Sequence, residues 1–264
     1  MKKILTVLLA AMLVFAFAAC GETEETTVAD TTEVVVDTTA AETTVADTTA
    51  AETTGADAVE FPAVMSYAEY AAAELDTAVT VECYVQAHQS WWDNKVTVYA
   101  QDADGAYFLY EMACSEEDAA KLVPGTKILV KGFKGAWAGE VEIMDATFEF
   151  VEGADTFVAE AMDATALLGT EELINHQNKF VSFKGMTVEA IEFKNGEPGD
   201  DIYVTVSKDG ASYSFCVERY LTGPETEVYA AVSALKAGDV IDVEGFLYWY
   251  EGVNTHITAV AAAQ

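Results

Sequence analysis

The sequence predicts a mainly β protein in which two similar five-stranded domains follow a long disordered linker. Apolar and polar residues alternate through several short runs that are separated by Gly- and Asp-rich turns, which is the pattern of half-buried strands. One motif occurs once in each half of the chain beyond residue 58. Residues 21–58 have a composition that cannot form a hydrophobic core.

Residues 1–20 are expected to be a targeting segment. Lys2 and Lys3 precede an apolar run from Ile4 to Ala19 that is interrupted only by Thr6. This run is shorter than the ~20 residues of a membrane-spanning helix. Its length and its positive start are typical of a secretory signal peptide. The run ends in small residues followed by a cysteine, in the order Phe17-Ala18-Ala19-Cys20-Gly21.

This ending resembles the lipobox of bacterial lipoproteins, although Phe17 stands where that family usually has an aliphatic residue. The resemblance implies that Cys20 becomes the first mature residue and is lipidated. It also implies an extracytoplasmic protein that is anchored to the bacterial cell membrane, since several acyl chains anchor stably. The alternative is an ordinary secretory peptide in which Cys20 has no role.

Residues 21–58 are expected to form a disordered tether. The segment has ten carboxylates but no Lys, Arg or aromatic residue, and it repeats itself: Thr26–Thr32 recurs as Thr43–Thr49. Such a chain repels itself and would span about 35 Å as a flexible coil. The sequence also allows an O-glycosylated, Thr-rich stalk.

The remaining residues predict two domains, 59–153 and 154–264, each of a typical size. Both contain the spacing G-x-x-I-x-V-x-G-F-x-x-x-aromatic-x-G, which starts at Gly125 in the first domain and at Gly238 in the second. Seven positions therefore agree at a constant offset of 113 residues. This agreement indicates an internal duplication.

Each domain has the order strand, strand, strand, helix, strand, strand. The expected strands of the first domain are 79–87, 95–101, 106–112, 127–133 and 140–151, with a helix at 115–122 that Ser115 caps. The expected elements of the second domain are strands at 180–193, 202–207 and 212–218, a helix from Pro224 to Leu235, and two closing strands. A short helix is also expected before each domain, at 65–75 and 164–175.

This order is that of the OB-fold, a five-stranded Greek-key barrel with a helix between its third and fourth strands. Both halves resemble OB-fold domains, in particular those of bacterial extracytoplasmic lipoproteins. We therefore predict two tandem OB-fold-like barrels. The second glycine of the shared motif would permit the bend of a strand that coils round a barrel. The alternative is a pair of other small β-barrels or sandwiches.

The sequence predicts no enzyme, no cofactor and no metal site. The three histidines, His88, His176 and His256, are far apart, and no catalytic or nucleotide-binding motif is present. The acidic segments 102–105 and 195–201 are interpreted as turns rather than as cation sites. Cys83, Cys114 and Cys216 are odd in number, so at least one is free, and a bridge between Cys83 and Cys114 is left open.

Aromatic residues are the candidate ligand-binding residues. Trp91 and Trp92 fall in the first connection of the first domain and Trp137 in its last hairpin, and these loops flank the usual binding face of an OB-fold. The last hairpin of the second domain adds Tyr248, Trp249 and Tyr250. The alternative is that these side chains cap the barrels or pack between the two domains.

The net charge of −32 limits the partners that we expect. The chain has 13 Lys+Arg against 45 Asp+Glu, and −24 of the excess belongs to residues 59–264. Because phosphate binding needs clustered cations, this balance predicts no nucleic acid partner. We expect a non-catalytic extracytoplasmic binding module for an oligosaccharide or a protein partner, which would bind through the loops of the first domain. The alternative is a structural component of the cell envelope without a small ligand.

Overall fold

The computed structural model describes residues 59–263. The predicted signal peptide, the predicted lipidation site at Cys20 and the predicted linker lie outside these residues. None of the helices among them is long and apolar enough to cross a membrane.

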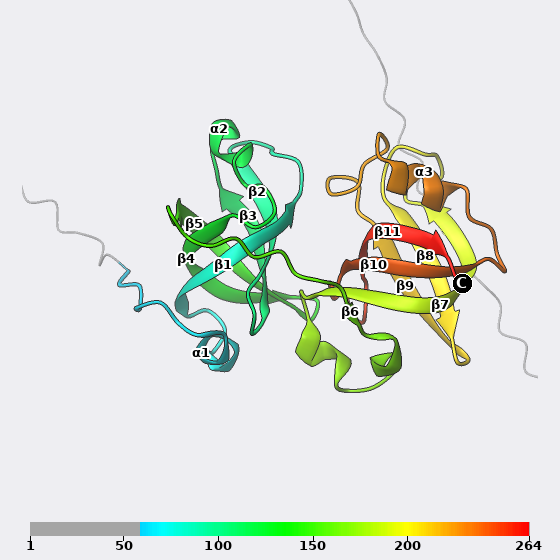
Figure 1. Cartoon of the computed structure of the whole chain (residues 1–264), viewed down its shortest axis with the longest axis horizontal. Helices are drawn as coiled ribbons and strands as arrows, with labels where there is room; N and C mark the ends of the chain where they lie inside the picture. Colours follow the sequence, from blue (N-terminus) through cyan, green and yellow to red (C-terminus); the bar gives the residue numbers. More distant parts are fainter. Residues whose placement is uncertain (1–58, 264) are drawn as a thin grey trace, which may run out of the picture. The chain divides into compact units, whose positions relative to one another are not determined.

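The first half of the described chain forms a closed five-stranded barrel, which confirms the prediction of a mainly β protein with an OB-like barrel (Figure 1). The strands follow one another round the barrel in the order β1-β2-β3-β5-β4. They are β1 (Ala78–His88), β2 (Lys95–Gln101), β3 (Ala106–Ala113), β4 (Lys127–Trp137) and β5 (Glu140–Phe150). A parallel pairing of β3 with β5 closes the ring.

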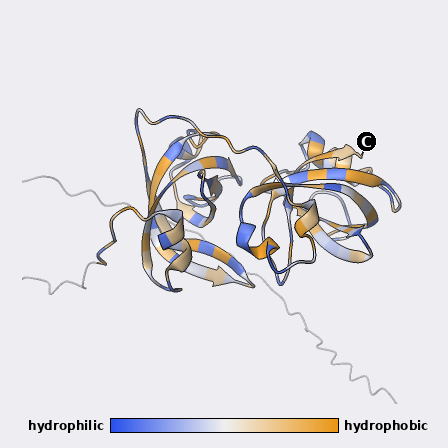
Figure 2. Ribbon diagram, turned by 60° about the horizontal axis from the view of Figure 1, so that its bottom comes forward, coloured by the Kyte–Doolittle hydropathy of each residue, from blue (hydrophilic) through white to orange (hydrophobic). Residues whose placement is uncertain are grey.

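Alternation of apolar and polar residues accounts for this barrel. In β1 the side chains of Val79, Val81, Cys83 and Val85 are fully buried in the core, and Figure 2 shows apolar and polar segments alternating along the strands. At Gly132 the pairing of β4 with β5 shifts register. A Cβ atom there would lie 2.7 Å from the Ile143 side chain, so the bend needs a glycine.

The helices are shorter than the sequence predicts. α1 (Tyr67–Ala72) is held by a capping box of Ser66 and Glu69. α2 (Glu116–Ala119), between β3 and β4, has the expected cap at Ser115. α3 (Glu227–Ser233) begins after Thr226, whose side chain accepts a hydrogen bond from the Tyr229 N–H, and not at Pro224. The expected helix at 164–175 is instead two turns of 3-10 helix, Thr165–Leu167 and Leu173–His176.

The second half forms a six-stranded sheet in the order β10-β11-β9-β8-β7-β6, with an additional pairing of β10 with β7 (Figure 1). Its strands are β6 (Met162–Asp163), β7 (Phe180–Phe193), β8 (Ile202–Lys208), β9 (Ala211–Val217), β10 (Val240–Phe246) and β11 (His256–Ala262). The β10–β7 pairing joins five of these strands in the same cyclic order as the barrel. α3 lies between β9 and β10 in the chain.

A small aromatic cluster joins the barrel and the second sheet. Its buried members are Tyr99, Phe108 and Phe246, and Tyr248 packs against them. The rings of Tyr99 and Phe246 are stacked, with centroids 4.5 Å apart. The Tyr99 hydroxyl also lies 2.6 Å from Nδ1 of the buried His256. We call this contact region the junction.

The cysteines and acidic turns have structural roles. Cys83, Cys114 and Cys216 are all buried and free, so the bridge between Cys83 and Cys114 is not formed. Burial raises the pKa of the Cys114 thiol to about 11. Asp102 closes its hairpin by accepting hydrogen bonds from the N–H groups of Asp104 and Gly105. Within residues 59–263 no three His, Cys, Asp or Glu side chains are grouped to hold a metal.

Candidate functional site

A groove with a volume of about 550 Å³ lies beside the connection between β1 and β2, within the size range of small-molecule sites. The barrel contributes one side of it and the turn after β9 contributes the other. We call it the groove. Its lining residues are Gln89, Ser90, Trp92, Asp93, Lys95, Val96, Thr97, Glu111, Arg219 and Tyr220.

Trp92 is the most exposed of the large apolar side chains in the described chain, with 78% of its surface accessible. A tight turn holds it in place. Trp92 and Lys95 exchange two backbone hydrogen bonds of 3.0 and 2.9 Å, and Asp93 and Asn94 between them have positive φ values of 47° and 60°. Asn and Asp tolerate this left-handed conformation better than most residues. The turn therefore presents the indole ring to solvent on a fixed backbone.

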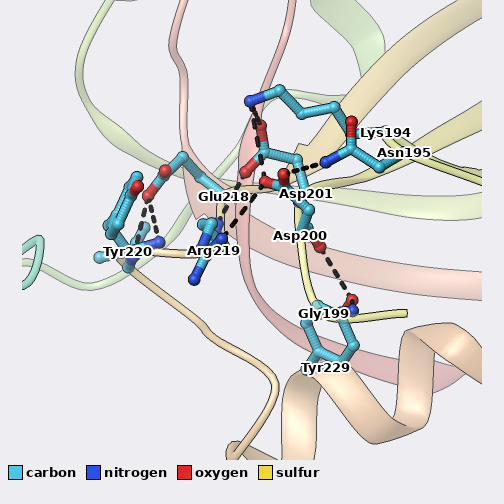
Figure 3. A network of polar contacts seen from close by, with 10 residues as sticks. Lys194, Asn195, Gly199, Asp200, Asp201, Glu218, Arg219, Tyr220 and Tyr229 are labelled. Carbon is cyan, nitrogen blue, oxygen red and sulfur yellow. Dashed lines mark hydrogen bonds and ion pairs between the residues drawn. The ribbon is translucent and has the colours of Figure 1, made fainter. Parts of the chain in front are cut away.

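The opposite side of the groove is the turn that carries Arg219 and Tyr220. One carboxylate oxygen of Glu218 accepts the N–H groups of Tyr220 and Leu221 at 2.9 and 2.8 Å. Asp201 accepts the N–H of Arg219 at 3.0 Å, and Figure 3 shows these contacts. Burial raises the pKa of Glu218 to about 7. Carboxylates therefore fix the backbone of this turn.

The guanidinium group of Arg219 remains available at this site. It lies 5.0 Å from the Tyr220 ring, within range of a cation–π contact, and 4.0 Å from a carboxylate oxygen of Asp200. The neighbouring Asp201 does not pair with the guanidinium, since its carboxylate binds the Lys194 ammonium group at 2.8 Å. Within residues 59–263 the guanidinium donates no hydrogen bond, so its planar set of N–H donors can bind a ligand.

Sequence reasoning missed Arg219 and Tyr220, although a signal was present. Arg219 is the only arginine among the 264 residues. It also lies between an acidic residue, Glu218, and the aromatic Tyr220. The sequence could not show that Trp92 and Arg219 lie in the same groove, since they belong to different halves of the chain.

The charged side chains that line the groove balance one another. Lys95 binds Glu111 at 2.7 Å on the surface, and this contact lowers the pKa of the Glu111 carboxyl. Asp93 and Arg219 are the remaining acid and base. The lining therefore combines two exposed aromatic rings with two cationic and two anionic side chains, so that its net charge is zero.

The three predicted tryptophans do not converge on one site. Trp92 lines the groove, but Trp91 is half-buried against the barrel core, where its Nε1–H donates a 2.9 Å hydrogen bond to the Cys114 carbonyl. Trp137 is 63% exposed at the end of β4, and it lines neither the groove nor the other two cavities described for this part of the chain. Trp91 therefore packs on the core while its neighbour Trp92 is exposed.

The aromatic residues of the second half are mostly packing residues. Tyr248 stacks on His256 with ring centroids 4.3 Å apart. Trp249 packs against the core of the second sheet, and its backbone N–H donates to the buried Glu140 at 2.8 Å. Tyr250 is 52% exposed. Tyr248 and Trp249 therefore pack at the junction.

Glu140 is the most perturbed carboxyl group of the junction. It is fully buried, and this burial raises its pKa to about 8, although the hydrogen bond that it accepts from the Trp249 N–H acts in the opposite direction. Burial also raises the pKa of Glu142. Neither residue lines the groove. Their position in the packed junction indicates a structural role. Because burial disfavours their charged forms, the free energy of unfolding depends on pH through them.

Comparison with known proteins adds distant structural neighbours only. No family model matches the chain, and no curated protein matches it. A murine DNA-binding protein bound to double-stranded DNA is 12% identical, with a TM-score of 0.35 over 70% of this chain and 96% of that one. The p204 HINb domain is 13% identical, with a TM-score of 0.33 over 72% and 97% of the two chains. At these scores the superpositions carry no argument about what this chain binds.

The prediction that a nucleic acid partner is absent is withdrawn. Neighbours of this fold include the Ifi202 HINa domain in complex with double-stranded DNA and a replication protein A heterotrimer bound to single-stranded DNA. The physical error lies in using net charge as the criterion. Net charge is a sum over the whole chain, whereas binding depends on a local surface, and the groove has no net charge. We therefore withdraw this exclusion.

Proposed function

We propose that this protein is a non-catalytic, lipid-anchored extracytoplasmic binding module that holds a neutral oligosaccharide in the groove. Cys20 would carry the anchor, and residues 21–58 would act as the tether. The second sheet would be a second OB-like barrel, because its five joined strands repeat the cyclic order of the first. The observation that carries the binding role is the groove itself.

The lining of the groove suits a sugar. Aromatic rings such as those of Trp92 and Tyr220 can stack on the apolar faces of sugar rings. Arg219 and Lys95 can donate hydrogen bonds to hydroxyl oxygens, while Asp93 and Glu111 can accept them from hydroxyl groups. A neutral ligand matches a lining in which the charges cancel. The fixed backbones on both sides reduce the entropy that binding must overcome.

A binding titration tests this proposal. A Cys20→Ser chain, which is not lipidated, would be titrated with linear neutral oligosaccharides of the malto, cello, xylo and manno series while tryptophan fluorescence is recorded. We expect a saturable change with at least one series, because Trp92 is exposed and lines the groove. Single-stranded and double-stranded oligonucleotides are titrated in parallel. Saturable binding of oligonucleotides with no response to any saccharide would refute the proposal.

A second candidate function is an envelope component that binds another protein. Trp137 and Tyr250 are both exposed and outside the cavities. The loops that carry them are linked, since the Glu251 N–H donates a 2.7 Å hydrogen bond to the Ala138 carbonyl. Crosslinking in cells from positions 137 and 250 tests this role. Recovery of one stoichiometric partner that is lost in Trp137→Ala would support it, and no specific crosslink would count against it.

A further inference from the structure

A second cavity of about 370 Å³ adjoins the groove on the outer surface of the barrel. The two share Lys95 and Glu111 as lining residues. The remaining lining residues of the second cavity are Tyr110, Ala113, Met144, Asp145, Ala146 and Thr147. The Lys95–Glu111 ion pair therefore lies where the two hollows meet.

An irregularity in β3 places two neighbouring side chains on the same outer face. In a regular strand Tyr110 and Glu111 would point to opposite faces. Here Glu111 has a φ of 44°, its N–H donates to Oγ1 of Thr97 at 3.1 Å, and the β2–β3 pairing shifts register between Val96 and Val98. Both side chains are exposed as a result. Glu111 lines both hollows, and Tyr110 lines the second.

The second cavity, like the groove, combines an aromatic ring with polar groups. Tyr110 provides an aromatic ring that is 44% exposed, and Asp145 and Thr147 provide polar groups. The dividing pair is not a wall, because the side chains of Lys95 and Glu111 are 50% and 46% exposed and lie on the surface. Exposed ion pairs of this kind hold their geometry weakly, so a ligand can pass over them or displace them.

We propose that the two cavities are successive subsites of one groove that binds several consecutive units of a linear neutral oligosaccharide. This inference rests on the proposed function and specifies its ligand as a chain rather than a single sugar. Trp92 and Tyr220 hold units at one end, and Tyr110 holds a unit at the other. The chain crosses the Lys95–Glu111 pair, whose donors and acceptors bind its hydroxyl groups.

A length series tests the two subsites separately. Dissociation constants of the Cys20→Ser chain would be measured by calorimetry for malto-, cello-, xylo- and manno-oligosaccharides of two to six units. We expect the affinity to rise about tenfold or more between two and six units in the series that binds, since linked subsites act together. The Tyr110→Ala variant should lose this gain with the disaccharide affinity unchanged. The Trp92→Ala variant should weaken binding at every length.

Controls make the outcomes distinct. Tyr250→Ala removes a comparably exposed aromatic ring outside both cavities and should leave every affinity unchanged. Circular dichroism and thermal unfolding of each variant check that it folds. Equal affinity for two and six units, or equal effects of Tyr110→Ala at all lengths, would overturn the two-subsite proposal while leaving the proposed function intact. No binding at any length would overturn the proposed function as well.

Discussion

The backbone N–H of Ser90 donates a 2.8 Å hydrogen bond to the carbonyl oxygen of Tyr220. Ser90 belongs to the connection that follows β1, and Tyr220 belongs to the turn that follows β9. This bond therefore ties the two sides of the groove together across 130 positions of sequence. Residues from both halves of the chain therefore line one groove.

We predict that Trp92→Ala weakens binding of a neutral oligosaccharide by about tenfold, or about 1.4 kcal/mol. The reason is that the indole ring is exposed and has no packing role to lose, so its removal affects the ligand and not the core. Calorimetric titration gives the affinity. The unfolding free energy should change by less than about 0.5 kcal/mol.

Trp137→Ala is the matched control, since Trp137 is also exposed but lies outside the cavities. It should retain wild-type affinity. An equal loss of affinity in the two variants would mean that the ligand does not occupy the groove.

We predict that Arg219→Lys lowers the affinity for the same ligand by about tenfold although the charge is kept. Lysine lacks the planar fork of N–H donors that the guanidinium group presents beside Tyr220. The backbone contacts of this turn do not involve the arginine side chain, so thermal unfolding should be unchanged. Lys121→Met, titrated in parallel, is the control for charge. Lys121 is a surface cation that pairs with Glu117 and Asp118 of α2. A loss in Lys121→Met alone would contradict the prediction.

We predict that the protein loses stability as the pH rises from 6.5 to 8.5. Burial raises the pKa of Glu140 from 4.5 to about 8 and that of Glu218 from 4.5 to about 7. The folded state then binds more protons than the unfolded state, so the unfolding free energy falls with rising pH between these values. His256 acts in the opposite direction, because burial lowers its pKa from 6.5 to about 3, but its effect is confined below pH 6.5.

Urea unfolding at a series of pH values measures this dependence. Glu140→Gln, which keeps the shape and an acceptor for the Trp249 N–H, should show a shallower decline above pH 6.5 and exceed the wild type in stability at pH 8.5. Glu152→Gln changes an exposed carboxylate and should follow the wild-type curve. If Glu140→Gln also followed that curve, the pKa of Glu140 would not be raised in the folded protein.

We predict that Cys20→Ser releases the protein from the membrane fraction. The sequence 17–21 resembles a lipobox, and the cysteine thiol would be the site of acylation. Fractionation of cells that express each form, with metabolic labelling by a fatty acid, measures the effect. The wild type should be labelled and pelleted with membranes, and Cys20→Ser should be unlabelled. Labelling of both forms would show that another residue carries the lipid.

Local patterns predicted the strands well. The bounds of β2 and β7 agree with the sequence prediction, because each is a run of alternating residues between clear turn signals. Gly132 and Gly245 both lie at register shifts, in agreement with the bend expected at the repeated motif. The helices were less predictable: the sequence pattern predicts a helix start at Pro224, whereas α3 begins after the N-cap residue Thr226.

The residues of the candidate site were only partly predictable. Sequence placed Trp91 and Trp92 together, but their roles differ because one ring faces the core and the other faces solvent. No local pattern could assign Arg219 to the same groove as Trp92, since their proximity arises from packing between the two halves. Net charge could not exclude a partner either, because a sum over the whole chain does not describe the charge of one surface.

Hydrogen–deuterium exchange with and without a saturating neutral hexasaccharide locates the ligand on the protein. We expect slower amide exchange on binding in two segments that are distant in sequence, 89–97 and 218–221, with a smaller effect at 110–113 and 144–147. Exchange at 134–142, around Trp137, should not change. Protection that is confined to 134–142, or that is absent from 218–221, would contradict a ligand site in the groove.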